Sequence, residues 1–292
     1  MMEWDGPQQR EVQLTFDRVA ERYDRHAALE QEIGSRLLER LEYLRRPPQR
    51  ILDLGCGTGS SCAELKHRYR KAQVIGLDRS MAMLVRTQKR SGLLRPLRAV
   101  RADFAELPLA DQSVDLVFSN LAFQWCSNPT ALFNEIRRVI APGGMLLFSS
   151  LGVGTLNELD AAWASLHESA RMAPFADILE LGDALMAAGF QEPVMDAERI
   201  SLNYSRVSSL LEELEATGMT GFLRGDLAVH EFTAALESAY RSFTVNGRYP
   251  VSFEVVYGTA FGPEDGQPRK TAQGDVVTFS VDALRKAKPK KS

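Results

Sequence analysis

Short apolar runs of strand length alternate with helical patterns through the middle of the chain. The apolar runs are Ile51–Leu54, Val74–Leu77, Leu97–Val100, Leu116–Phe118 and Met145–Phe148. Helical patterns separate most of them, at Cys62–Tyr69, Met81–Gln88 and Ala131–Ile140. Strands that alternate with helices predict a mostly parallel sheet covered on both faces, which is a doubly wound α/β fold.

Helical spacing also dominates on both sides of this core. Residues 11–45 read as helix up to RRPPQR, whose two prolines cannot continue it. After Ser150 the pattern is mainly helical, apart from a possible strand at Val194–Leu202 and a β-branched, aromatic one at Val251–Phe261. We therefore expect five regions: an N-terminal helical arm (1–50), a cofactor-binding core (51–155), a helical lid with a late strand (156–250), a final core strand (251–262) and a polar, disordered tail (263–292).

The composition points to a globular protein of the cytoplasm. The 292 residues are 45% hydrophobic, which is enough for a sizeable core, and no apolar stretch approaches the length of a membrane span. The N-terminus has no basic start followed by an apolar run, so we expect no export signal. Three cysteines without CxxC spacing and four histidines without ligand spacing predict a reduced protein that needs no metal.

The charge is distributed unevenly. Lys66–Arg101 contains eleven basic residues and one acid, whereas Leu151–Tyr240 contains fifteen acids and four arginines. Both stretches could be solvated faces, or the basic one (66–101) could dock an acidic partner. Nucleic acid is not expected, because Tyr69 is the one aromatic residue in the basic stretch.

Three glycines in ILDLGCGTGSS directly follow the first predicted strand. Gly55, Gly57 and Gly59 permit positive φ and let backbone amides approach a ligand closely. A dinucleotide fingerprint would need glycine where the chain has Ser60, and no GKS or GKT follows for a phosphate loop. Asp53 beside the loop would repel a pyrophosphate and suits a cationic ligand. The pattern favours S-adenosylmethionine (AdoMet), which carries an ammonium and a sulfonium.

Acids also end the next two predicted strands. Asp78, followed by Arg79, is placed to bind both ribose hydroxyls, and Asp103 to meet the adenine amino group with Phe104 beside the ring. Cys56 lies inside the loop, where we interpret it as a small packing residue that lines the cofactor. Three acids around this loop predict an AdoMet-dependent methyltransferase.

Further motifs carry a more specific resemblance. FDRVAERYDRHA followed by ILDLGCGTG resembles the class I methyltransferases. SNLAFQW, GTLNEL and GRYPVSFEV resemble the malonyl-acyl-carrier-protein O-methyltransferases of biotin synthesis, from about Phe16 to Phe261. The resemblance implies a seven-stranded Rossmann-like sheet and methylation of the free carboxylate of malonyl-acyl-carrier protein or malonyl-CoA. The methyl ester would hide a charge from the enzymes of fatty-acid elongation, and AdoMet would become S-adenosylhomocysteine.

This chemistry needs no general base, because a malonyl carboxylate is already ionised at pH 7. We therefore assign catalysis to positioning and expect no acid or base residue. By resemblance, Tyr23 closes over AdoMet, while Asn120, Gln124 and Trp125 follow the fourth strand at the rim where the methyl group points. Asn120 and Tyr23 are also expected to contact the cofactor.

An arginine fork would suit the substrate carboxylate. The candidates are Arg25, Arg199, Arg224 and Arg248, of which GRYP favours Arg248. The stretch LEATGM departs from the family, since Glu215 and Met219 stand where lysine and alanine are usual. Two alternatives therefore stay open: a methyltransferase for a quinone precursor or another carboxylic acid, and a non-catalytic methyltransferase-like partner protein.

Overall fold

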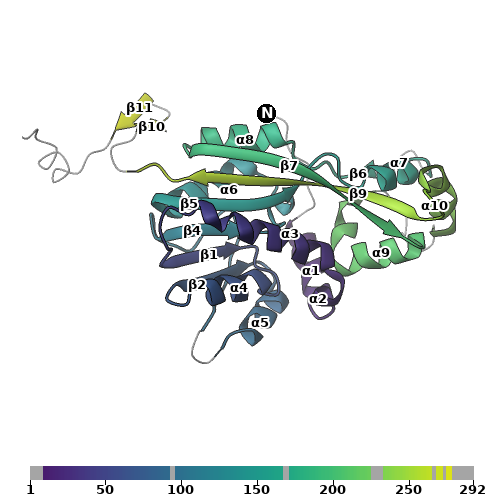
Figure 1. The fold of residues 1–292 in the computed structure, drawn as a ribbon, viewed down its shortest axis with the longest axis horizontal. Coiled ribbons are helices and arrows are strands. Elements are labelled where there is room, and N and C mark those ends of the chain that lie inside the picture. Colours follow the sequence, from purple (N-terminus) through teal and green to yellow (C-terminus); the bar gives the residue numbers. More distant parts are fainter. Residues whose placement is uncertain are drawn as a thin grey trace, which may run out of the picture.

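A seven-stranded sheet forms the centre of the molecule, in the order β3–β2–β1–β4–β5–β9–β7 (Figure 1). The computed structural model describes residues 9–92, 96–166, 171–224, 233–264, 268–271 and 274–277. The strands are β1 (Arg50–Leu54), β2 (Gln73–Asp78), β3 (Arg98–Arg101), β4 (Val114–Ser119), β5 (Ile140–Leu151), β7 (Gln191–Tyr204) and β9 (Tyr249–Phe261). The first five pair in parallel, and β9 pairs antiparallel with β5 and β7. The predicted doubly wound, mostly parallel α/β sheet is confirmed.

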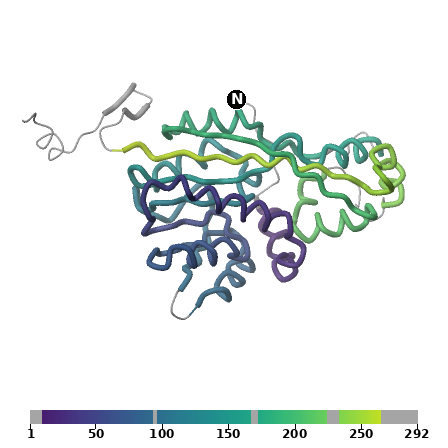
Figure 2. The backbone as a smooth tube through the Cα atoms, viewed as in Figure 1, coloured from purple at the N-terminus to yellow at the C-terminus, as the bar shows by residue number. Residues whose placement is uncertain are grey.

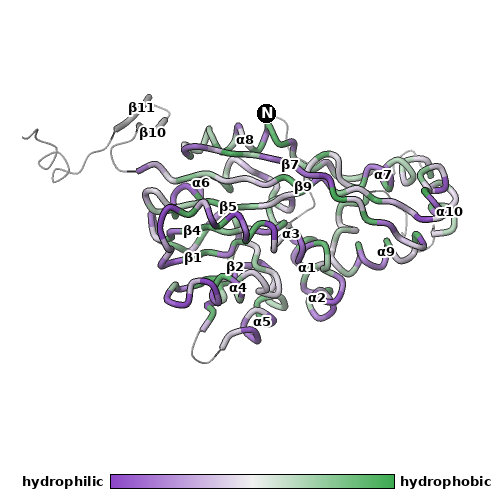
Figure 3. Tube along the Cα trace, in the orientation of Figure 1, coloured by the Kyte–Doolittle hydropathy of each residue, from purple (hydrophilic) through white to green (hydrophobic). Residues whose placement is uncertain are grey.

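Helices cover both faces of this sheet. One face carries α3 (Ala28–Glu39), α4 (Ser60–Arg68) and α5 (Met81–Lys89), and the other carries α6 (Pro129–Val139) and α8 (Ile178–Ala187). Successive strand residues point to opposite faces, so Ile51 packs into one core cluster and Leu52 into the other. Because both faces are buried, these strands are continuous apolar runs. The peripheral helices instead alternate between hydrophobic and hydrophilic residues (Figure 3).

The N-terminal arm is broken where the sequence predicts one helix over 11–45. It consists of α1 (Gln9–Val19), α2 (Tyr23–His26), α3 and the 3-10 helix η1 (Arg40–Tyr43). The break has a tertiary cause at Asp24, which accepts hydrogen bonds from Thr58 Oγ1 at 2.5 Å and Arg90 Nη2 at 2.7 Å. These bonds hold α2 against the glycine loop.

Two long strands, β7 and β9, connect the core to the lid. β9 pairs with β5 only from Val255 to Phe261, but with β7 along its whole length. The outer halves of β7 and β9 therefore extend beyond the core as a two-stranded ribbon (Figures 1 and 2). This ribbon lies with α7 (Asn157–Ala164), α9 (Val207–Ala216), α10 (Thr233–Tyr240), the 3-10 helices η3 (Met219–Phe222) and η4 (Arg241–Phe243), and the short strands β6 (Arg171–Met172) and β8 (Leu223–Arg224).

The region 156–250, expected to be a helical lid with one late strand, contains further strands and a helix that belongs to the core. α8 packs against α6 and the sheet, and belongs to the core rather than the lid. The late strand expected near 194–202 runs from Gln191 to Tyr204. In the expected disordered tail, β10 (Pro268–Thr271) and β11 (Gly274–Val277) form an antiparallel pair, and residues 265–267, 272–273 and 278–292 lie outside the described residues.

None of the helices in the described ranges is long and apolar enough to cross a membrane.

Candidate active site

The glycine loop between β1 and α4 combines left-handed backbone with close contacts. Gly55, Gly57 and Gly59 have φ of 76°, 52° and 82°. A Cβ on Gly55 would lie 2.3 Å from the Cβ of Ala122 and 3.2 Å from the ring of Phe104. Gly55 is therefore needed for conformation and for space, because two other segments of the site close onto it.

Asp78 at the end of β2 is fixed by backbone donors. Its Oδ2 accepts a hydrogen bond from the N–H of Gly57 at 2.9 Å, and its Oδ1 accepts one from the N–H of Ser80 at 2.8 Å. Burial raises the pKa of this carboxyl above its ordinary value. The acid thus ties the glycine loop to the start of α5 while it lines the cavity between them.

Asp103 follows β3 and forms an ion pair with Arg79 across the same cavity. Its other oxygen accepts a hydrogen bond from the N–H of Ala105 at 3.0 Å. The two residues expected to face the cofactor therefore also contact each other. Phe104, next in the chain, lies against the glycine loop through the contact at Gly55.

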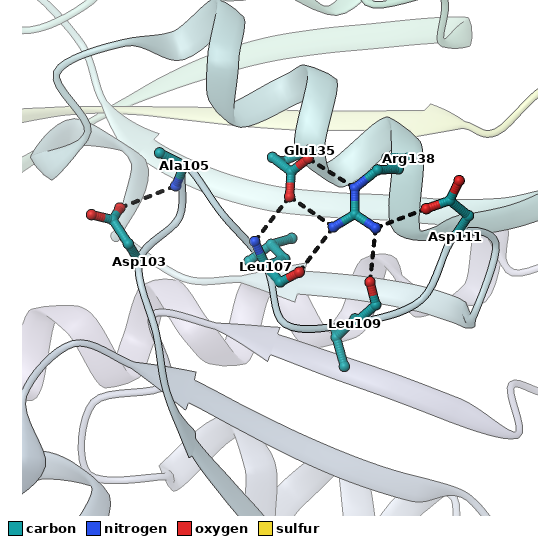
Figure 4. A network of polar contacts seen from close by, with 7 residues as sticks. All are labelled: Asp103, Ala105, Leu107, Leu109, Asp111, Glu135 and Arg138. Carbon is teal, nitrogen blue, oxygen red and sulfur yellow. Dashed lines mark hydrogen bonds and ion pairs between the residues drawn. The ribbon is translucent and has the colours of Figure 1, made fainter.

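Arg138 of α6 holds the loop that carries Asp103, as Figure 4 shows. Its guanidinium donates to the carbonyl oxygens of Leu107 at 2.9 Å and Leu109 at 2.8 Å. It also pairs with Glu135, whose pKa it lowers through their hydrogen bonds. We did not identify these two residues from the sequence, where an i, i+3 pair on an amphipathic helix reads as an exposed ion pair.

A cavity beyond the carboxyl ends of β1, β2 and β4 brings together residues predicted to bind the cofactor, and we call it the cofactor cavity after that prediction. Its lining includes Tyr23, Gly55, Gly57, Asp78, Arg79, Asp103, Phe104, Asn120 and Trp125. A crevice at this edge of a doubly wound sheet is the usual ligand site of such folds.

A second cavity lies beside the first and shares Tyr23, Gly55, Gly57 and Asn120 with it. It adds Asp53, Cys56, Thr58, Ser61, Glu64 and Glu30. Asp53 is almost fully buried and accepts a hydrogen bond from Cys62 Sγ at 3.1 Å. Its burial raises the pKa to about 7. Asp53 and Asp78 therefore line two adjoining cavities that share part of the glycine loop.

Glu30 of α3 is a further acid that we missed in the sequence. It lines the second cavity and also an inner cavity under the lid. Burial raises its pKa to about 7, and Glu213 contributes in the same direction. In the sequence, Glu30 resembles any polar position of an amphipathic helix, and only the structure shows that it is half-buried and lines two cavities.

The inner cavity is mostly apolar and adjoins the cofactor cavity. Its apolar lining comes from Phe16, Tyr23, Leu29, Leu121, Trp125, Leu151, Met219 and Phe253, and its polar lining from Glu30, Gln124 and Thr217. Tyr23 lines all three cavities, and burial raises the pKa of its phenol well above the ordinary value. The structure thus places Tyr23 where the three spaces meet.

The polar residues after β4 have distinct environments. Asn120 Nδ2 donates to the carbonyl of Glu30 at 2.9 Å, and its Oδ1 accepts from Ser149 Oγ at 2.8 Å. Gln124 is buried and its Nε2 donates to the carbonyl of Leu121 at 2.7 Å. Within the described ranges, Gln124 Oε1 finds no hydrogen-bond partner. Gln124 also lines the inner cavity.

The candidate arginines are not brought together at these cavities. Arg248 is exposed in a turn closed by backbone bonds to Val245, and it lines none of the three spaces. Arg199 donates to Ser252 Oγ at 2.7 Å and pairs with Glu158 in the lid. Arg25 is exposed on α2, and the side chain of Arg224 lies outside what the structure describes.

The comparisons with known proteins agree with this architecture. A family model described as "Methyltransferase domain" matches residues 52–148. The malonyl-acyl-carrier-protein O-methyltransferase of Halorhodospira halophila is 44% identical over 94% of this chain and 95% of its own length. The protein of the same name from a Methylovorus strain is 42% identical over 87% of this chain and 88% of its own.

A solved structure resembles the fold at lower identity. It is phosphoethanolamine N-methyltransferase 2 of Haemonchus contortus in complex with AdoMet, which is 22% identical to this chain with a TM-score of 0.52. The match covers 79% of this chain and 53% of that one. At this identity the likeness supports the fold alone.

Proposed function

Because this chain belongs to the malonyl-acyl-carrier-protein O-methyltransferases, we propose that it methylates the free carboxylate of a malonyl thioester with AdoMet. The chain is a class I methyltransferase and its cofactor is AdoMet. When bound, AdoMet supplies an electrophilic methyl group on a sulfonium. The proposed products are the malonyl methyl ester and S-adenosylhomocysteine.

The donor set of the cofactor cavity and the second cavity fits this cofactor. In the cofactor cavity, Asp78 is placed to accept hydrogen bonds from ribose hydroxyls, and Phe104 and Met83 offer apolar contacts to the adenine. In the second cavity, Asp53 and Glu30 offer carboxylates to the ammonium group. A ligand that carries positive charge and no phosphate suits this acidic lining.

The inner cavity suits the reaction itself. A carboxylate that attacks a sulfonium methyl group converts an anion and a cation into two neutral molecules. An apolar, water-poor site therefore favours the transition state over the separated charges. Trp125, Leu151 and Phe253 supply such walls directly beside the cofactor cavity. This adjacency of an apolar chamber to an acidic cofactor site is the observation that carries the proposal.

Positioning falls to residues at the junction of the cavities. Tyr23, which separates the inner cavity from the other two, is proposed to cover the reacting methyl group. Asn120 is held from both sides by Glu30 and Ser149 and is proposed to orient the cofactor. Gln124 and Trp125 are proposed to place the thioester. A proton acceptor is not needed, since the substrate carboxylate is already ionised.

Only part of the basic stretch 66–101 lies on the side of the molecule that holds the cavities. Lys66 Nζ donates to the carbonyl of Ala72, just before β2, at the sheet edge opposite the cavities. Arg86 and Arg90 instead bond Glu21 O and the Asp24 carboxylate beside the cofactor site. We propose that an acidic carrier docks on the α5 side only, since its arm must reach the inner cavity. The three cysteines are free, buried thiols, which supports a reducing cytoplasmic setting.

The test is an assay of S-adenosylhomocysteine formation with malonyl-acyl-carrier protein and malonyl-CoA as substrates. We expect formation to depend on the malonyl group and to be lost with acetyl-carrier protein, which has no free carboxylate. Turnover of a quinone precursor or another carboxylic acid without turnover of either malonyl thioester would support a different small-molecule methyltransferase. A protein that does not bind AdoMet would be a non-catalytic relative.

A further inference from the structure

We infer that the groove between α1 and the η3–β8 segment holds the phosphopantetheine arm of the carrier-bound substrate. This inference rests on the proposed function and adds the route by which the thioester enters. One wall comes from Leu14, Thr15, Arg18 and Arg22 on the helical arm, and the other from Thr220, Gly221 and Leu223 under the lid. Trp125 lies at the inner end.

The position of Trp125 connects this groove to the reaction chamber. Its indole lines the groove, the inner cavity and the cofactor cavity alike. It is held by Phe222, with ring centroids 4.3 Å apart, and by an edge contact with Phe16 at 5.2 Å. A chain that lies in the groove and passes this indole therefore arrives beside the cofactor.

The chemistry of the groove suits a long chain with amides and few charges. Leu14 is 49% exposed on one wall and offers apolar contact. Thr15 and Thr220 add hydroxyl groups on opposite walls. The residues of α1 that line the groove run from Glu11 to Val19, so this wall is about 12 Å long, and an extended pantetheine chain can follow it.

Polar groups of the groove and of the adjoining inner cavity match the polar groups of the arm. At the inner end, Gln124 Oε1 lacks a partner among the described residues, and the cysteamine amide of pantetheine supplies an N–H donor near the thioester. Along the groove, Arg18 and Arg22 are exposed, and guanidinium groups suit a phosphate. Arg22 pairs with Glu215 at 2.9 Å, with both side chains more than 40% exposed. Such an exposed pair is weak enough for a phosphate to compete.

A larger side chain introduced at Gly221 can narrow the groove without steric strain. A Cβ at this position would lie 3.4 Å from the Trp125 ring, an ordinary contact, and the residue is exposed. We expect Gly221→Val to lower kcat/KM for malonyl-carrier protein at least about tenfold with the AdoMet dissociation constant unchanged. Gly182→Val on α8 is the matched control, because its nearest neighbour atom is Met195 Cγ at 3.9 Å. Unchanged kcat/KM in Gly221→Val would overturn the inference.

Cross-linking tests the route without using activity. Thr220→Cys is mixed with a carrier whose pantetheine arm ends in a haloacetamide, which alkylates a thiol that it can reach. The native cysteines are buried, so background is low. Leu179→Cys, 74% exposed on α8, is the control. We expect a covalent complex with Thr220→Cys alone. Equal labelling of both variants, or none at position 220, would refute the groove as the route. If the wild-type protein fails to methylate malonyl-carrier protein, the proposed function fails instead.

Discussion

Asp78 Oδ2 accepts a hydrogen bond from the backbone N–H of Gly57 at 2.9 Å, so the acid that ends β2 also fixes the glycine loop. Its second oxygen is occupied by Ser80 N–H. A carboxylate oxygen accepts more than one hydrogen bond, so ribose hydroxyls can be bound in addition. The residue therefore couples the shape of the loop to the presence of cofactor.

Replacement of Asp78 separates these two roles. Asp78→Ala removes both acceptors and leaves the N–H of Gly57 and Ser80 without them, so we expect AdoMet affinity to fall at least about a hundredfold. Asp78→Asn keeps one acceptor oxygen and should lose less. Isothermal titration calorimetry measures both dissociation constants. Affinity in Asp78→Ala within a few fold of wild type would contradict this role.

Gly55 and Gly57 share a left-handed backbone conformation but differ in the space around them, so alanine substitutions can be compared between the two positions. Both have positive φ, but a Cβ on Gly55 meets Ala122 at 2.3 Å, whereas nothing lies within 4 Å of one on Gly57. Gly57→Ala should cost the strain of the left-handed conformation alone, roughly 1 kcal/mol. Gly55→Ala should cost clearly more and abolish AdoMet binding. Urea denaturation gives the free energy of unfolding. Equal losses in the two variants would show that the contact with Ala122 is unimportant.

Burial of Asp53 and Glu30 predicts an unusual dependence of stability on pH. Their pKa is raised from ordinary values of 3.8 and 4.5 to about 7 in the folded protein without cofactor. Between pH 4 and 7, approximately, the folded state therefore binds more protons than the unfolded state. The free energy of unfolding should fall as pH rises through this window.

The Glu30→Gln variant tests the contribution of one of the two acids. It should show a shallower fall in the free energy of unfolding between pH 5 and 7.5, roughly. The exposed control Glu42→Gln should follow the wild-type curve. Because bound AdoMet favours the ionised carboxylates, cofactor binding near pH 7 should release protons, which calorimetry in buffers of different ionisation enthalpy detects. A curve for Glu30→Gln that is parallel to wild type would contradict the assignment.

The parts of the fold and site that the sequence predicts are those governed by local rules. Strands that are buried on both faces appear in the sequence as apolar runs. Residues at the ends of parallel strands lie at one edge of the sheet, so the sequence alone predicts that Asp78, Asp103 and the glycine loop are close together. Asp78, Asp103 and the glycine loop lie in one cavity because their strands are neighbours in the sheet. The alternation of strands and helices in the sequence predicts such a parallel sheet.

Features created by tertiary packing were missed. The arm breaks at α2 because Asp24 bonds Thr58 and Arg90, partners 34 and 66 residues away. In the sequence Glu30 resembles a surface residue, but in the structure it lines the second and inner cavities. Arg138 resembles one partner of a surface ion pair, but it bonds the loop that carries Asp103. Arg248, suggested by resemblance, lies in an exposed turn and lines none of the three cavities.

Charge reversal on α5 tests the narrowed docking face. Arg86→Glu, beside the cofactor edge, should raise KM for malonyl-carrier protein several-fold, because surface charges mainly affect association with an acidic partner. The effect should shrink at high salt. Arg68→Glu, on α4 where its side chain bonds Leu38 O, is the control and should change KM little. Equal effects of both substitutions, or none, would contradict docking on this side.

The mass of the intact malonyl-carrier protein after incubation with this protein and AdoMet tests the central claim most directly. The proposal predicts a mass gain of one CH2 on the malonyl-pantetheine arm, because the product is a methyl ester. It also predicts no gain on acetyl-carrier protein. An unchanged mass of the malonyl arm, under conditions where AdoMet binding is verified by calorimetry, would contradict the proposed methyl transfer.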